Sequence, residues 1–284
     1  MRIGVDLGGT KIEIVVLDSD RAERLRRRVA TPAGDYDATV SAIASLVREA
    51  QEIAGEDAPI GIGTPGSTSK RSGLIVNANS TVLIGKPLQA DVERAIGRRV
   101  RMTNDANCFA LSEAADGAAA GAAVAFGVIL GTGVGGALAI RTRILEGANG
   151  IAGEWGHNPL PWPRPDEMPG PPCYCGKYGC IETFLSGPAL ARERAAAGDE
   201  AALEQYEDRL ARALATIVNI VDPDVVVLGG GVSNIARLYE NVPQLLPRYV
   251  FSDFVRTKLL QARHGDSSGV RGAAMLWAEG EYDG

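Results

Sequence analysis

The sequence lacks an excess of positive charge, and this absence argues against a nucleic-acid partner. Its 284 residues carry 29 Lys and Arg against 35 Asp and Glu, a formal net charge of −6, so there is no basic surplus to neutralise a phosphate backbone. Five arginines gather between Arg21 and Arg28, but Ala22, Glu23 and Leu25 interrupt them. We interpret this segment as a solvated helix or hairpin edge in preference to a binding patch.

Long hydrophobic runs are also missing. No apolar stretch approaches the roughly 20 residues that cross a bilayer, and a strand is already expected from residue 3. The sequence therefore predicts no signal peptide and no membrane partner, and we expect a cytoplasmic protein. A chain of this length with 45% hydrophobic residues suits two closely joined domains around a cleft.

Cysteine is scarce, yet three of the four cysteines lie within eight positions. Cys173, Cys175 and Cys180 follow His157, which lies sixteen residues before the first of them, and make a Cys3His set suited to tetrahedral zinc. Such clustering favours a metal site in a reducing compartment over a disulfide framework. Buried free thiols, or one disulfide with an odd cysteine, are the alternatives. We expect a closed structural zinc site rather than a catalytic one.

Apolar runs and turn residues predict an α/β chain in which one plan occurs twice. A strand, a Gly-rich turn and a second strand open the chain, and residues 124–140 repeat that plan, which indicates a degenerate duplication. In chain order, the predicted elements are strands at 3–7 and 12–17, a helix over 39–54, strands at 60–63 and 99–103, a helix over 108–115, strands at 124–130 and 137–140 around a turn at 131–136, a helical stretch over 187–221, a strand at 225–228 and a helix over 270–278.

Two Gly-rich turns have the composition of phosphate cradles. The first spans Asp6 to Lys11 and the second Gly131 to Gly136, and both offer backbone amides and a hydroxyl to a ligand. A tight hairpin also favours Gly-Gly, so one such turn alone is ambiguous. Two of them, one in each half, can clamp a polyphosphate from opposite sides of a cleft. Neither has P-loop spacing, and a strand instead of a dinucleotide-binding helix follows the second.

Asp105 is the carboxylate expected to act as catalytic base toward a sugar hydroxyl. The alternative is a helix N-cap, a position that Asp and Asn both favour. Asn104 can donate to and accept from a sugar hydroxyl, and Asn79 and Glu182 offer similar chemistry. Gly229 to Gly231 follow a buried strand and would let backbone lie against a base or ribose, although a helix-entry turn explains them almost as well.

With these residues in hand, the chain resembles the ROK family of sugar kinases, repressors and related open reading frames over essentially its whole length. The matching segments are DLGGTK from Asp6, NDAN from Asn104, LGTGVGG from Leu130, GEWGH from Gly153, CYCGKYGCIE from Cys173 and DPDVVVLGGG from Asp222. The resemblance implies an actin-like, ribonuclease H-like ATPase fold. The smaller lobe would hold residues 1–115 and the last helix, about 271–284, and the larger, zinc-binding lobe residues 116–270. It also suggests a homodimer.

The resemblance further implies a hexose and ATP as substrates, with Mg²⁺ and structural zinc as cofactors. Asp105 would be the base, and Asp6 would help position Mg²⁺. His157 would serve zinc and sugar through different ring nitrogens, so zinc would orient a sugar contact rather than perform the transfer. The implied sugar-binding residues are Gly66, Asn79, Asn104, Asp105, Glu154, His157 and Glu182. The implied nucleotide-binding residues are Asp6, Gly8, Gly9, Thr10, Lys11, Thr132, Gly133, Gly229, Gly230 and Gly231.

Within the family, residues 77–81, 153–162 and 264–274 look most like the bacterial fructokinase (manno-fructokinase) branch, so the expected reaction converts D-fructose to fructose 6-phosphate. N-acetylglucosamine, mannose or glucose kinase is the alternative, because epimer choice depends on a few hydrogen bonds. A sugar sensor or transcription regulator is an alternative of another class. Family regulators carry a helix-turn-helix segment ahead of the kinase-like body, which here begins at residue 1 of an acidic chain, so we expect an enzyme.

Overall fold

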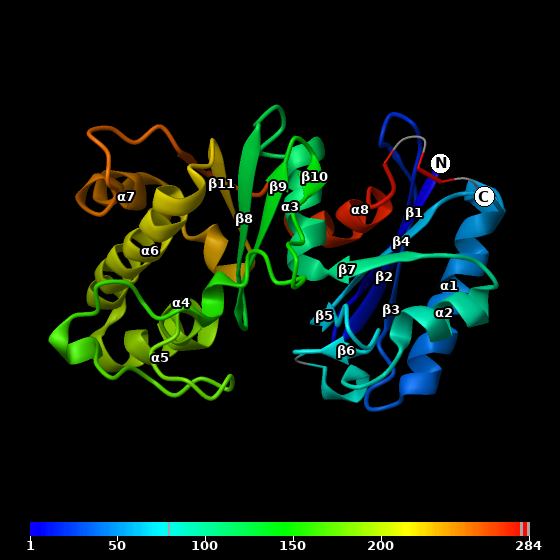
Figure 1. Ribbon diagram of the computed structural model, residues 1–284, viewed down its shortest axis with the longest axis horizontal. Coiled ribbons are helices and arrows are strands. Elements are labelled where there is room, and N and C mark those ends of the chain that lie inside the picture. The colour runs from blue at the N-terminus through cyan, green and yellow to red at the C-terminus, as the bar shows by residue number, and fades with distance from the viewer. Residues whose placement is uncertain (79, 279–280, 283–284) are drawn as a thin grey trace. The chain divides into compact units, whose positions relative to one another are not determined.

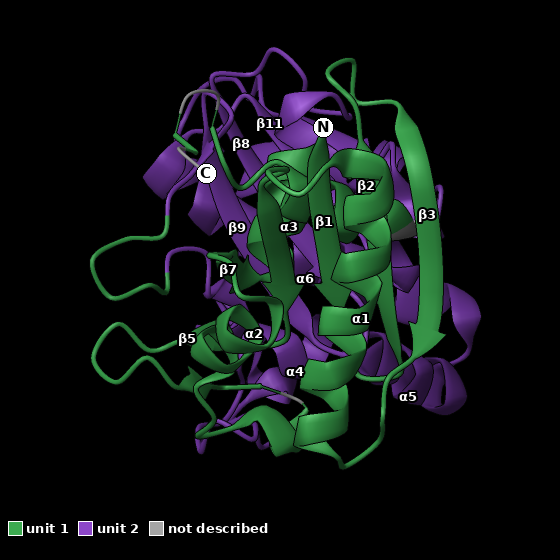
Figure 2. Cartoon of the chain, turned by 90° about the vertical axis from the view of Figure 1, so that its right-hand side faces the viewer, with its two compact units in different colours: residues 1–112, 146–151, 266–284 green, residues 113–145, 152–265 purple. Residues whose placement is uncertain are grey.

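The computed structural model describes residues 1–78, 80–278 and 281–282, and the chain divides into two compact units. The first unit comprises residues 1–112, 146–151 and 266–284, and the second comprises 113–145 and 152–265 (Figure 2). The first boundary thus lies at Ser112, where the sequence suggested residue 115. Residues 146–151 and 266–270 also join the first unit, although we expected them in the larger lobe.

A mixed five-stranded sheet forms the centre of the first unit. Its strands are β1 (Arg2–Leu7), β2 (Lys11–Leu17), β3 (Glu23–Ala30), β4 (Ile60–Thr64) and β7 (Arg101–Asn104), in the order β3-β2-β1-β4-β7. β1 pairs antiparallel with β2 and parallel with β4. The unit also holds α1 (Tyr36–Ala54), α2 (Leu88–Ile96), α8 (Ser268–Ala274), most of α3 (Asp105–Ala115) and the small ribbon of β5 (Ser67–Thr68) and β6 (Ile75–Val76).

Alternation along β1 explains how both faces of this sheet are covered. Ile3 and Val5 are fully buried in a core with residues of α1, whereas Gly4 faces α8 (Figure 1). A Cβ at Gly4, or at Gly61 of β4, would collide with the α8 backbone. Only glycine allows a helix to lie this close to the sheet, so the chain's last helix packs directly on its first strand.

The arginine-rich segment forms the edge strand β3, in line with the hairpin-edge interpretation. Its side chains are mostly solvated, and they pair with acids of neighbouring elements. Arg26 and Arg28 each place Nε 2.6 Å from the buried carboxylate of Glu13, and Arg27 pairs with Glu49. Charged side chains are common on edge strands because they discourage pairing with another chain.

The second unit repeats the strand plan of the first. Its sheet consists of β8 (Val124–Leu130), β9 (Val134–Ile140), β10 (Arg143–Ile144), β11 (Val225–Gly229) and β12 (Lys258–Gln261), in the order β10-β9-β8-β11-β12. An antiparallel hairpin again precedes parallel strands, so the duplication predicted from the sequence is present. The helices are α4 (Ile181–Leu185), α5 (Gly187–Ala197), α6 (Asp199–Val221) and α7 (Leu238–Leu245).

Several predicted elements have other bounds in the structure, and α8 ends at Ala274 where the helix was predicted to reach residue 278. The helical stretch over 187–221 breaks at Gly198, whose φ of 85° ends α5 before α6 begins. The turn of the second hairpin is shorter than predicted because β9 starts at Val134. α3 begins at Asp105, ahead of the predicted start at residue 108. Within the part of the chain that the structure describes, no helix has the length and hydropathy of a membrane span.

A buried ion-pair network anchors the loop that leads into the cysteines. Glu167, only 6% exposed, accepts hydrogen bonds from Arg209 at 2.8 Å and from Arg212 at 2.7 Å. Both arginines project from α6, and Arg212 also donates to the Trp162 carbonyl at 2.8 Å. Since these charges satisfy one another away from water, the loop is fixed to the longest helix of the unit.

Candidate active site

The first hairpin of the first unit has an accessible turn next to a half-buried carboxylate, that of Asp6. The Gly8 amide donates to the Lys11 carbonyl at 2.9 Å and closes the turn, and Gly9 and Thr10 at its tip are exposed. A Cβ at Gly9 would meet nothing within 4 Å, so a ligand can approach the backbone amides here. Lys11 lies 4.0 Å from Glu13, measured from Nζ to Oε2.

Asp6 sits at the base of this hairpin among other acids. Its pKa is raised to about 7, chiefly by burial. The negative charges of Asp105 and Glu13 also raise this pKa, whereas the positive charges of Lys11 and Arg28 lower it. Carboxylates that repel one another in this way are stabilised by a cation. Oxygen donors suit Mg²⁺, so Asp6 and its surroundings fit the predicted magnesium position.

Asn104 and Asp105 mark the junction of β7 and α3. Asn104 Oδ1 accepts the Asn107 amide at 2.8 Å, so Asn104 is the residue that caps the helix. Asp105 Oδ1 accepts the Ala106 amide at 2.8 Å. The Asp105 side chain still reaches solvent, but the protein around it removes part of its hydration and raises its pKa above 3.8. Asp105 therefore combines accessibility with a proton affinity suited to a base.

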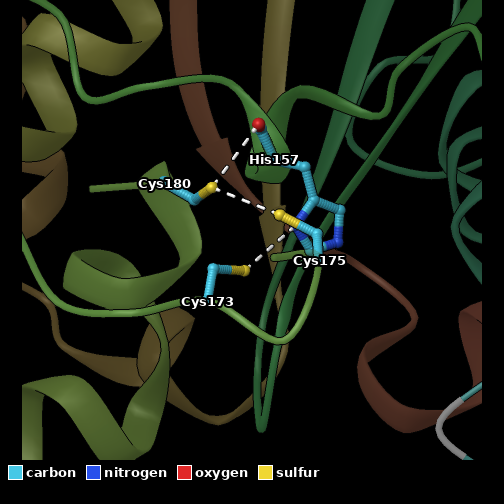
Figure 3. Close-up of side chains that lie close together, drawn as sticks. All are labelled: His157, Cys173, Cys175 and Cys180. Atoms are coloured by element: carbon cyan, nitrogen blue, oxygen red, sulfur yellow. Dashed lines mark hydrogen bonds between the residues drawn. The ribbon is translucent and has the colours of Figure 1, made fainter. Parts of the chain in front are cut away.

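The second unit brings His157, Cys173, Cys175 and Cys180 together (Figure 3). Their ligand atoms all lie within 4.8 Å of one another. Cys175 Sγ is 3.6 Å from Cys180 Sγ, and Cys173 Sγ is 3.5 Å from His157 Nδ1. A tetrahedral zinc with bonds of about 2.3 Å to sulfur implies sulfur separations of about 3.8 Å. The cluster fits zinc, and the four cysteines are free of disulfides.

Two glycines shape the loop that carries the cysteines. Gly176 and Gly179 have φ angles of 85° and 66°, a region that L side chains avoid. The Cys173 amide donates to the Lys177 carbonyl at 2.8 Å, which turns the chain back after Cys175. Cys175 is thereby returned toward Cys180, and the short Cys-x-Cys spacing is accommodated.

His157 uses its two ring nitrogens in different directions. Nδ1 faces the cysteines, whereas Nε2 is 2.9 Å from the Tyr174 hydroxyl. Burial raises the pKa of Tyr174 to about 12, with the charges of Glu182 and Glu154 acting in the same direction. The two carboxylates implied in sugar binding thus act electrostatically on the Tyr174 hydroxyl, and their side chains can accept from sugar hydroxyls.

The indole of Trp155 holds the Glu154–His157 segment against the sheet. Its Nε1 donates to the Gly135 carbonyl at 3.0 Å, and its ring meets Phe126 edge-on at 5.8 Å. A Cβ at Gly136 would lie 2.6 Å from the Trp155 ring, so glycine is required for this packing. Trp155 is a core residue, and its packing positions Glu154 and His157, two of the predicted sugar-binding residues.

Residues 2–280 match the sequence model of the ROK family. The chain belongs to the ROK family. The N-acetyl-D-glucosamine kinase of Escherichia coli O6:H1 is 42% identical to it, over 97% of this chain and 99% of that protein. The ROK hexokinase of Thermus thermophilus has a TM-score of 0.83 and 34% identity, over 97% of both chains. A ROK glucokinase of Streptomyces griseus, solved with glucose and AMPPNP, has a TM-score of 0.77 and 30% identity, over 97% and 98%.

Membership of the ROK family confirms the predicted sugar kinase and its actin-like ATPase fold. The narrower prediction of the fructokinase branch is not supported, since relatives at 39–42% identity are N-acetyl-D-glucosamine kinases. Choice between related hexoses depends on a few hydrogen bonds, whose geometry the segments at 77–81, 153–162 and 264–274 do not specify.

A pocket of about 690 Å³ in the second unit of this ROK protein lies beside the second Gly-rich turn. Among the predicted nucleotide residues, Thr132 and Gly231 line it. Gly230, with a φ of 83°, packs on the Leu130 backbone, and Gly229 ends β11. The remaining wall was missed by sequence reasoning because apolar helix residues carry no motif. It includes Pro188, Leu190, Ala191, Val232 and Ile235.

The other predicted residues of the ROK site are Gly66, Asn79 and Gly133. Gly66 adopts a φ of 73° between β4 and β5, where a Cβ would meet the Val76 carbonyl at 2.5 Å, so its backbone role is structural at least. Asn79 lies outside the described residues. Gly133 and Glu182 adjoin each other, because a Cβ at Gly133 would lie 2.6 Å from Glu182 Oε2.

Proposed function

We propose that this ROK protein is an N-acetyl-D-glucosamine kinase that transfers the γ-phosphate of ATP to a sugar hydroxyl. The observation that carries the proposal is the 42% identity to an N-acetyl-D-glucosamine kinase over 97% of this chain. The groups described above supply the chemistry. Asp105 removes the proton from the attacking hydroxyl, and Asn104, Glu154, His157 and Glu182 hold the sugar.

The nucleotide uses both hairpins in this proposal. The backbone amides of Gly9 and Thr10 at the exposed tip bind phosphate oxygens, and Asp6 would hold Mg²⁺, which would neutralise phosphate charge. The pocket lined by Thr132 and Gly231 accepts the adenosine, since its wall is largely apolar. Phosphoryl transfer needs little covalent chemistry from a protein, so positioning and charge account for most of the rate.

A substrate panel tests the proposal. Release of ADP from Mg-ATP should be measured with N-acetylglucosamine, fructose, mannose and glucose, and kcat/KM compared. We expect N-acetylglucosamine to exceed the other sugars by about 10-fold or more, the scale of discrimination that a few substrate contacts provide. A preference for fructose would reverse the assignment to the fructokinase branch. No release of ADP with any of the four sugars would indicate a sugar sensor instead of an enzyme.

The metal cluster yields a second prediction. When bound by His157, Cys173, Cys175 and Cys180, zinc supplies a fixed anchor for the His157 ring, whose Nε2 is then left for the sugar. We expect about one zinc per chain, and Cys180→Ser should lose it and raise the sugar KM by about 10- to 100-fold. The control is Cys108→Ala, which removes the cysteine of the first unit and should retain zinc. Zinc-free wild-type protein with a normal KM would contradict this.

A further inference from the structure

The side chain of Glu182 connects two motifs that the sequence treats as separate. Glu182 follows Cys180 of the metal cluster by two residues, yet its Oε2 accepts the backbone amide of Val134 at 2.9 Å. Val134 is the first residue of β9, directly after the turn that contributes Gly131 and Thr132 to the nucleotide pocket. One carboxylate oxygen of the predicted sugar set is therefore engaged with the predicted phosphate hairpin.

The turn is shaped to receive this carboxylate. A Cβ at Gly133 would lie 2.6 Å from Glu182 Oε2, so the carboxylate occupies the space that any other side chain would need. A second bond holds the other end of the turn, where the Gly187 amide donates to the Gly131 carbonyl at 2.7 Å. The segment from Glu182 to Gly187 thus holds both ends of the turn through hydrogen bonds.

The backbone of Glu182 is in turn fixed to the metal segment. The Ile181 amide donates to the Asn158 carbonyl at 2.9 Å, next to His157. The Thr183 hydroxyl donates to the Cys180 carbonyl at 2.7 Å. A displacement of the cysteine cluster or of the sugar-binding carboxylate is therefore transmitted to the hairpin through a single short helix, α4.

We propose that Glu182 is a positioning residue that couples sugar binding to nucleotide binding within the second unit. This inference rests on the proposed function. Oε2 keeps its bond to the Val134 amide while Oε1, which has no hydrogen bond to the described residues, accepts from a sugar hydroxyl. A bound sugar restrains the carboxylate and so the hairpin, and by reciprocity a nucleotide on the hairpin tightens the sugar.

The test places a substitution in the nucleotide hairpin and measures sugar binding in the absence of nucleotide. Gly133→Ala displaces the Glu182 carboxylate, so the sugar Kd by calorimetry should rise about 10-fold. Ile140→Ala, an exposed position at the other end of β9, is the control, and its sugar Kd should stay at the wild-type value. In wild type, AMPPNP should lower the sugar Kd about 5-fold or more, and Gly133→Ala should abolish this effect.

Glu182 variants test the same link from the other side. Glu182→Ala should raise the Kd of AMPPNP, measured without sugar, about 10-fold, because a charge-assisted hydrogen bond to the hairpin is lost. Glu182→Gln keeps an acceptor oxygen and should restore most of the nucleotide affinity. A normal sugar Kd in Gly133→Ala, or a normal AMPPNP Kd in Glu182→Ala, would overturn the coupling. Preference for another hexose would refute only the proposed substrate, and the titrations would then use that sugar.

Discussion

Asp105→Asn should lower kcat by about 10² to 10⁴ while sugar affinity stays close to that of the wild type, the usual scale for loss of a general base. Asparagine preserves the size of the side chain and its acceptor for the Ala106 amide, but it cannot take a proton from the sugar hydroxyl. Single-turnover kinetics should place the loss in the chemical step. A kcat near that of wild type would remove Asp105 from the mechanism.

The pH profile gives this prediction a second measure. The protein around Asp105 raises its pKa above 3.8, and a base works only when ionised. The kcat of the wild type should therefore rise with pH through an apparent pKa above 3.8. This rise of kcat with pH should be absent in Asp105→Asn. Asp37→Asn, an exposed change on α1, is the control and should keep both kcat and the profile within about twofold of wild type.

Glu167→Gln should lower the free energy of unfolding by about 3 kcal/mol, because it leaves the buried guanidinium groups of Arg209 and Arg212 without their shared carboxylate. Urea denaturation measures the change. Asp166→Asn, the exposed neighbour in the same turn, should shift stability by at most about 0.5 kcal/mol. Equal stability of the two variants would show that the other partners of these arginines suffice.

The same network predicts an acid-dependent loss of stability. Burial alone would raise the pKa of Glu167, but hydrogen bonds from Arg212 and Arg209 outweigh it and lower the pKa from 4.5 to about 2. A depressed carboxyl pKa stabilises the folded state fully above the ordinary value. The contribution of Glu167 should therefore be complete above pH 4.5 and disappear as the pH falls toward about 2, and Glu167→Gln should lack this dependence.

The sequence was informative where local chemistry alone determines the outcome. The cysteine spacing with its glycines predicted the metal cluster, and apolar runs predicted β1, β2, β4, β8 and β11. The arginine-rich sequence of β3 did not predict a strand by itself. An edge strand that is solvated along most of its length shows no clear alternation of polar and apolar residues. β12 was missed because four residues, Lys258–Gln261, become a strand only through parallel pairing with β11.

The candidate site was predictable in its chemical groups and less so in their contacts. Residue type and spacing singled out Asp105, His157 and the cysteines as candidates, and the structure brings His157 and the three cysteines of the motif together. The bond from Glu182 to Val134 joins residues 48 positions apart, and nothing local to either residue encodes it. Apart from Arg194, the pocket residues of α5 are small or apolar, and apolar positions at helical spacing are equally typical of a core.

The packing of α8 on Gly4 and Gly61 also has a consequence for folding during translation. The first unit includes residues 266–274, which are synthesised after residues 113–145 and 152–265 of the second unit. Domains generally fold as units during translation. The first unit is therefore completed only after the second unit has been synthesised, and until then the face of β1 and β4 that receives α8 is uncovered.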